Sequence, residues 1–157
     1  MILEKFELSI LEVTGTDLFT NQTYELKKEK VVILNRSIES IPVLVKEGSF
    51  IVLSKDEGNS TNNPSNLEVL SYFGNGKYDF YEDKNEKIAI TKFKSIVKDN
   101  KQIITISTKG KLDVIPNNRV MTIKFKNIFD GKVVVYENDK ELDNCIYDLD
   151  VLAVRNN

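Results

Sequence analysis

Short runs of β-branched and aromatic residues, separated by turn signals, dominate this chain. It contains 16 isoleucines and 15 valines in 157 residues. Branching at Cβ restricts χ1 and suits the pleated surface of a sheet, so these residues favour strands over helices. In many of the runs apolar and polar residues alternate, as expected when one face of a strand is buried. The pattern predicts strands over 5–13, 24–34 with a charged turn at 27–30, 42–45, 49–53, 67–69, 78–81, 88–93, 95–97, 102–107, 119–125, 132–137 and 151–154.

The spacing of these segments indicates the fold class. Strand segments recur roughly every 8–12 residues, and no stretch of ten or more residues shows a convincing helical period. This spacing is typical of an antiparallel β-sandwich or β-barrel. The polar segment 56–66 is the longest one without apolar residues, and it predicts a loop or a domain linker. We therefore predict an all-β chain with two domains, residues 1–66 and 67–157.

The charges and the absence of histidine narrow the chemistry. The chain has 22 Lys and Arg against 24 Asp and Glu, so its overall charge gives no reason to expect nucleic acid or an anionic membrane as a partner. It has no His, which removes the commonest general base and most zinc sites. The single Cys145 has no basic neighbour, and we expect a buried structural thiol. No cofactor is expected. The short apolar runs predict a soluble, cytoplasmic protein without a signal peptide or a membrane span.

Carboxylates are the remaining acid–base material. Glu82 and Asp83 are adjacent, and glycoside hydrolysis uses two carboxyl groups about 5–10 Å apart across a cleft. Neighbouring strand residues point to opposite faces, so a charged strand end is the favoured interpretation. The acidic segments 56–59 and 139–150 suggest calcium, but neither has the spaced ligands of a dedicated calcium loop, and solvated loop charge is favoured. Segment 74–77 predicts a hairpin turn rather than a phosphate loop, because it opens no helix.

Five aromatic residues surround one predicted hairpin. Exposed aromatic rings can form flat platforms for sugars, and Tyr72 and Tyr78 are the candidates for such a carbohydrate-binding surface. Alternation along a strand instead places at least some of the five in the core. Both interpretations remain open. The five residues are Tyr72, Phe73, Tyr78, Phe80 and Tyr81.

Two ordered motifs give the chain a resemblance to a known family. The first covers 15–24 and 37–53, and the latter range contains IPVLVKEGSFIVL. The second is GKYDFYED at 76–83, which follows a loop rich in Asn and Pro. In this order and at this separation, the motifs resemble the segment after the catalytic barrel in glycoside hydrolase family 31, which includes α-glucosidases and α-xylosidases. The chain departs from the family's pattern at Thr16, Val52 and Lys84-Asn85, as a divergent member would.

The resemblance implies two C-terminal β-sandwiches: a partial proximal one over 1–66 and a distal one over 67–157. In this family the catalytic aspartates lie on a (β/α)₈ barrel of about 250 residues. What precedes residue 14 is too short to hold a barrel, so no catalytic residue is carried over from the family. With no His and no dedicated calcium loop, no metal ligand is expected either. The resemblance implies structural roles for the signature residues Asp17, Pro42, Gly48, Tyr81, Glu82 and Asp83.

The function implied is that of a non-catalytic accessory region, present as a fragment or a truncated gene product. It would brace the barrel of an α-glucosidase-like hydrolase, in the same chain or in another, which cleaves terminal α-glycosidic bonds. Isolation from the barrel should expose apolar surface, with Phe50, Ile51 and Val52 as candidates, or lead to self-association. Two alternatives remain: a carbohydrate-binding module centred on Tyr72 and Tyr78, and a small β-sandwich adaptor that binds a protein through a strand edge.

Overall fold

β-Strands form nearly all of the regular structure. The computed structural model describes residues 3–10, 13–26, 30–37, 41–58, 62–99, 101–127, 136–137, 140–141, 147–148 and 151–155. Within these ranges every element is a strand except one short 3₁₀ helix, η1 (Leu112–Val114), which confirms the all-β prediction. The chain divides into two compact units, Met1–Glu47 and Gly48–Asn157.

The described residues of the first unit form five strands in two sheets. One sheet pairs β1 (Leu3–Ile10) with β4 (Lys30–Ser37) in antiparallel register. In the other, β2 (Val13–Asp17) lies between β3 (Thr23–Leu26) and β5 (Leu44–Lys46), antiparallel to both.

The single strand predicted over 5–13 is two strands in different sheets. β1 ends at Ile10 and β2 begins at Val13. The apolar alternation changes phase here, from Leu8 and Ile10 to Leu11 and Val13. One continuous strand would carry these two apolar sets on opposite faces, so a break between them lets the two strands be oriented independently.

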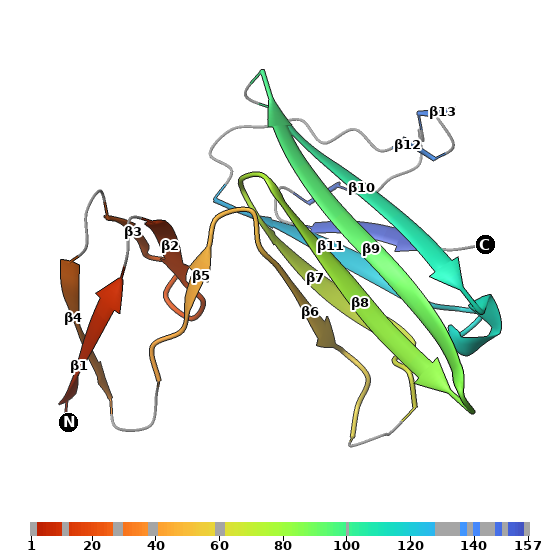
Figure 1. Cartoon of the computed structure of the whole chain (residues 1–157), viewed down its shortest axis with the longest axis horizontal. Coiled ribbons are helices and arrows are strands. Elements are labelled where there is room, and N and C mark those ends of the chain that lie inside the picture. The colour runs from red at the N-terminus through yellow and green to blue at the C-terminus, as the bar shows by residue number, and fades with distance from the viewer. Residues whose placement is uncertain are drawn as a thin grey trace. The chain divides into compact units, whose positions relative to one another are not determined.

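One sheet of the second unit is a three-stranded antiparallel meander. β8 (Gly76–Lys84), β9 (Lys87–Lys98) and β10 (Lys101–Gly110) form this sheet, with β9 in the centre (Figure 1). The strands predicted separately over 88–93 and 95–97 are both part of β9. Its alternation is unbroken, because Ala89, Thr91, Phe93 and Ser95 are all buried.

The other sheet of this unit has five strands in the order β14-β15-β11-β7-β6. Their bounds are β6 (Phe50–Ser54), β7 (Asn66–Tyr72), β11 (Val120–Lys126), β14 (Tyr147–Asp148) and β15 (Val151–Arg155). β7 and β11 are parallel, which departs from the predicted antiparallel order. A parallel pair needs a long crossover connection. Here β8, β9, β10 and η1 supply it. A two-residue pair, β12 (Tyr136–Glu137) and β13 (Lys140–Glu141), stands apart from both sheets in the pairing.

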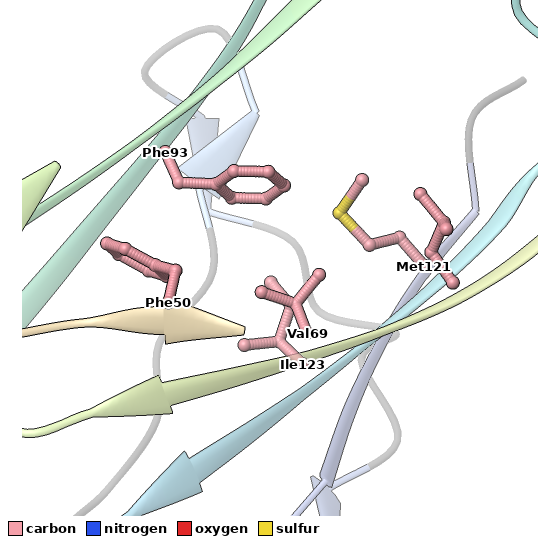
Figure 2. Close-up of a cluster of buried hydrophobic side chains, with 6 residues drawn as sticks. Phe50, Val69, Phe93, Met121 and Ile123 are labelled. Atoms are coloured by element: carbon pink, nitrogen blue, oxygen red, sulfur yellow. The ribbon is translucent and has the colours of Figure 1, made fainter. Parts of the chain in front are cut away.

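The hydrophobic core of the second unit forms between side chains of these two sheets. Phe50 on β6 and Phe93 on β9 face each other with ring centroids 5.6 Å apart, close to Val69 and Ile123 (Figure 2). Such aromatic pairs stabilise a core beyond the area they bury. The buried cluster consists of Phe50, Leu67, Val69, Phe93, Met121 and Ile123, with Val52, Phe80, Ile104, Ile106 and Phe125 packed against it.

The described residues 56–58 and 62–65 of the polar segment lie outside the strands of the second unit. They are between β6 and β7, which pair with each other in antiparallel register. The Asp56 carboxylate accepts hydrogen bonds from the N–H groups of Ser65 at 2.6 Å and Asn66 at 2.9 Å, and so closes the loop. The boundary predicted after residue 66 therefore falls inside a compact unit, and the division lies between Glu47 and Gly48. The assignment of the two parts to proximal and distal sandwiches stays a prediction.

Candidate functional site

The two motifs of the family resemblance meet at a pair of glycines. Gly48 has a φ of +74°, and a Cβ added to it would lie 2.2 Å from the carbonyl oxygen of Asn75. A Cβ on Gly76 would lie 1.9 Å from the carbonyl oxygen of Gly48. The Gly48 N–H donates to the Phe73 carbonyl at 3.1 Å. Only glycine permits so close an approach in this conformation, so Gly48 has a structural role.

Glu82, in the second motif, forms a buried ion pair with Arg119. The Arg119 Nη1 donates to Oε2 and Nη2 to Oε1, both at 2.6 Å, and the two side chains are 2% and 1% exposed. The Nε and Nη2 of Arg119 also donate to the Pro64 carbonyl at 3.0 and 2.7 Å. Because a bidentate pair fixes geometry as well as charge, it ties β8 to the polar loop and to the start of β11. The Glu82 carboxylate thus has a structural role in this ion pair.

The residues flanking Glu82 face solvent. Tyr81 is 63% exposed and Asp83 is exposed, whereas Phe80 packs against the core and Glu82 is buried. This alternation places Glu82 and Asp83 on opposite sides of β8. The two carboxyl groups therefore do not face a common cleft, and no acid–base pair of the glycosidase kind forms between them.

Asp17 organises the turn between β2 and β3. Its carboxylate is fully buried, and Oδ1 accepts hydrogen bonds from the N–H groups of Phe19 at 3.0 Å and Thr20 at 2.9 Å. Arg36 on β4 donates from Nη2 to Oδ2. The Asp17 N–H donates to the Gln22 carbonyl at 2.8 Å and closes the turn.

These contacts keep Asp17 ionised. Burial raises the pKa of the carboxyl group, but hydrogen bonds from the Thr20 N–H, from Arg36 and from the Phe19 N–H lower it by more, so the pKa of Asp17 lies below its ordinary value of 3.8. At neutral pH the charged carboxylate therefore holds the turn in a fixed conformation.

The turn presents a large apolar side chain to solvent. Phe19 is 66% exposed, Ile41 is 72% exposed and Val43 is 38% exposed. The Leu18 N–H donates to the Val43 carbonyl at 2.9 Å, so the segments that carry these three residues are backbone neighbours. We call Phe19, Ile41 and Val43 the apolar patch. Exposed apolar side chains on neighbouring backbone segments are candidates for an interaction site.

The residues predicted to form exposed apolar surface lie in the core or are half-buried. Phe50 is 7% exposed and belongs to the core, and Val52 packs against it, so their prediction as exposed surface is wrong. Ile51, between them, is half-buried. The physical reason is the pairing of β6 with β7 across the polar loop, which places Phe50 against Phe93.

The structure separates the two tyrosines predicted to bind carbohydrate. Tyr72 is 1% exposed, whereas Tyr78 is 41% exposed. Tyr72 ends β7 in the five-stranded sheet, and Tyr78 lies on β8 opposite Phe93 of β9. A buried ring presents no face to a sugar, so the two do not form an exposed aromatic platform.

Other predicted features lie in turns or outside the described residues. Pro42 is half-buried and lies just before β5, an edge strand of its sheet as the pairing shows, where a missing N–H is tolerated. Segment 74–77 joins β7 to β8, and here the chain crosses from the five-stranded sheet to the three-stranded one. The two strands are therefore not hairpin partners, and the prediction of a hairpin turn is wrong. Cys145 and most of the acidic segment 139–150 lie outside the described residues.

Sequence reasoning missed the two arginines that complete these clusters. Arg36 and Arg119 are two of only three arginines in a chain with 19 lysines. Arginine suits bidentate pairing with a carboxylate in a buried place, whereas lysine is favoured at exposed positions. The rarity of arginine was therefore a usable signal, although it does not name the partner.

Metal sites, membrane helices and relatives give this chain no assignment. Among the described residues, no group of three or more His, Cys, Asp and Glu side chains could hold a metal ion. Over the same residues, no helix has the length and hydropathy that crossing a bilayer requires. No protein-family model and no curated protein matches the chain.

Proposed function

We propose that this chain is a non-catalytic accessory region of a family 31 α-glucosidase-like glycoside hydrolase and that it braces the catalytic barrel. The barrel hydrolyses terminal α-glycosidic bonds, and this chain supplies no group to that reaction. The partial proximal and the distal β-sandwich that the motifs imply belong to the same proposal. A cytoplasmic location belongs to the same proposal.

The observation that carries the proposal is the apolar patch of Phe19, Ile41 and Val43. An accessory element separated from its barrel should expose apolar side chains, and these three are between 38% and 72% exposed. Full burial of one such side chain stabilises an interface by about 1.5–3 kcal/mol. The Asp17 turn fixes Phe19 before binding, which reduces the entropy lost on docking.

The contacts of the signature residues support the same proposal. Asp17, Gly48 and Glu82 each serve the packing of their own unit through hydrogen bonds, a close backbone approach or a buried ion pair. Residues with these contacts are needed for folding and are not available to a substrate. This agrees with an accessory role for the region that the motifs cover.

The alternatives have less support. A carbohydrate-binding module centred on Tyr72 and Tyr78 would need both rings exposed, and Tyr72 is buried. An adaptor that binds through a strand edge has edges available, since β8 and β10 flank the three-stranded sheet. Pairing at a strand edge, however, does not explain why Phe19 is exposed on a turn that the buried Asp17 carboxylate stabilises.

The proposal is tested by hydrolysis assays on the purified chain and on a mixture. The chain alone should release no glucose from maltose and no aryl group from an aryl α-glucoside. Added to a family 31 α-glucosidase from which the C-terminal region has been deleted, it should raise the temperature at which that barrel loses activity. Turnover by the chain alone that survives repurification would overturn the non-catalytic role.

Two matched variants distinguish docking through the apolar patch from nonspecific hydrophobic association. Phe19→Ser should abolish the protection of the barrel, because it removes the largest side chain of the apolar patch. Leu112→Ser changes a residue of similar exposure, 61%, in the second unit and should leave the protection unchanged. Equal effects of the two substitutions would contradict docking through the apolar patch.

A further inference from the structure

One face of the three-stranded sheet carries a concentration of positive charge. On β9 the residues Ala89, Thr91, Phe93 and Ser95 are buried, so the even-numbered residues face outward. Ile104 and Ile106 pack against the core, which turns the odd-numbered residues of β10 outward, and Phe80 does the same on β8. The outer face of β8, β9 and β10 (Figure 1) therefore carries six lysines and two aspartates: Lys77, Lys92, Lys94, Lys98, Lys101 and Lys109, with Asp79 and Asp83.

Four of these lysines surround an apolar pair at one end of the sheet. Lys77 lies directly opposite Lys94, and Lys98 lies directly opposite Lys101. Between the two pairs, Ile96 and Ile103 are opposite each other and are 41% and 52% exposed. Strands are about 4.8 Å apart, and four residues of a strand span about 13 Å, so these positions share one small area. We call Lys77, Lys94, Lys98 and Lys101 the lysine patch.

Like charges directly opposite each other destabilise an antiparallel sheet. Of the nearest acids, Asp79 is bonded to Lys92 at 2.8 Å, and Asp99 lies in the turn after Lys98. Among the described residues, no member of the lysine patch forms an ion pair with a carboxylate. The two lysine pairs therefore oppose folding locally, and such a conflict is expected where a surface binds a partner.

The balance of the whole chain conceals this local charge. Residues 48–127 contain 13 Lys or Arg against 9 Asp or Glu, whereas the rest of the chain contains 9 against 15. Salt screens exposed charges beyond about 8–10 Å, so a flat anionic surface responds mainly to the charges that face it. The near-neutral total is thus a poor guide to what the outer face of the sheet attracts.

We propose that the lysine patch binds the surface of an anionic lipid bilayer. At such a surface the lysine ammonium groups attract the anionic lipid headgroups. The exposed Ile96 and Ile103 side chains contact the boundary between the headgroups and the acyl chains. Single-stranded nucleic acid is less favoured, because it is held by aromatic stacking and no aromatic residue lies among the four lysines. The patch lies on the second unit and does not depend on the proposed accessory function.

The test is cosedimentation of the full chain with vesicles. Phosphatidylcholine vesicles in which roughly a third of the lipid is phosphatidylserine should bind the chain, and pure phosphatidylcholine vesicles should not. The double variant Lys94→Gln with Lys98→Gln should bind about 30-fold more weakly, because each lysine at such a surface contributes roughly a factor of five. Raising the salt to about 1 M should release the wild-type chain.

A matched double variant, Lys84→Gln with Lys111→Gln, removes the same charge away from the outer face and should bind as the wild type does. Thermal unfolding of both double variants establishes that they fold. Equal binding to neutral and anionic vesicles, or an equal loss in the two double variants, would overturn the proposal. So would displacement of the chain from vesicles by a single-stranded oligonucleotide at lower concentrations than soluble phosphatidylserine, which would assign the patch to nucleic acid.

Discussion

Replacing Glu82 with alanine should destabilise the second unit by about 3–5 kcal/mol. The change leaves the Arg119 guanidinium charged in a site that is 2% exposed, where the Pro64 carbonyl still accepts hydrogen bonds from it. Removing one partner of a buried ion pair has an effect of about this size, because the uncompensated charge stays out of water. The loss is comparable with the whole stability of a small domain, about 5–15 kcal/mol.

The double variant Glu82→Leu with Arg119→Met separates the charge from the packing. It removes both charges and fills much of their volume, so it should be less destabilising than Glu82→Ala. The Pro64 carbonyl then lacks its donor, which still costs about 1–3 kcal/mol. Measured against the single variants Glu82→Leu and Arg119→Met, the double variant should show a coupling of about 2 kcal/mol or more.

Urea unfolding followed by tyrosine fluorescence measures these values, because the chain has no Trp and Tyr72 is buried in the second unit. The midpoint should fall with little change in the slope of the transition. A loss below about 1 kcal/mol for Glu82→Ala, or additive single effects, would refute the argument that this pair is a buried structural link.

Three further predictions concern single positions. Gly48→Ala should lower the free energy of unfolding by about 1–3 kcal/mol or more, because φ is +74° and the added Cβ clashes with the Asn75 carbonyl. A midpoint of thermal unfolding equal to that of the wild type would contradict this prediction. Because the pKa of Asp17 is lowered, its stabilising contribution is complete well above pH 3.8 and is lost as the pH falls through the native pKa. Hydrogen exchange of the amide protons that are hydrogen-bonded to Asp17 should therefore accelerate in acid. Exchange rates that stay independent of pH after correction for intrinsic exchange would argue against this role. Lys94→Glu should stabilise the chain by about 0.2–1 kcal/mol, because it converts the like-charged pair with Lys77 into an opposite-charged one, and a loss of stability in urea would show the pair is not repulsive.

Local patterns predict the strands of this protein better than their pairing. The alternation over 88–97 is a local signal, and the structure places the single strand β9 there. Pairing is not local. The polar segment 56–66 has the composition of a linker, and only the hydrogen bonds of β6 with β7 show that it is a loop within one sheet. The parallel pairing of β7 with β11 depends on the same long-range contacts.

The candidate sites show the same limit. The motif containing Glu82 identifies a residue of structural interest, but the partner, Arg119, lies 37 residues further along the chain. Phe50 was expected at the surface because the family resemblance implies a missing barrel, and it lies in the core because β6 packs within the second unit. Phe19 gave no signal, because its exposure follows from the Asp17 turn, which only the hydrogen bonds reveal.

Calorimetric titration of the chain into a family 31 α-glucosidase barrel that lacks its own C-terminal region measures the proposed docking itself. The proposed function predicts saturable binding with a negative heat-capacity change, as burial of apolar surface requires. The double variant Phe19→Ser with Ile41→Ser should raise the Kd by about 100-fold, since two large apolar side chains contribute about 3 kcal/mol or more. Absence of binding by the wild-type chain, or an unchanged Kd for the double variant, would contradict a role in bracing the barrel through the apolar patch.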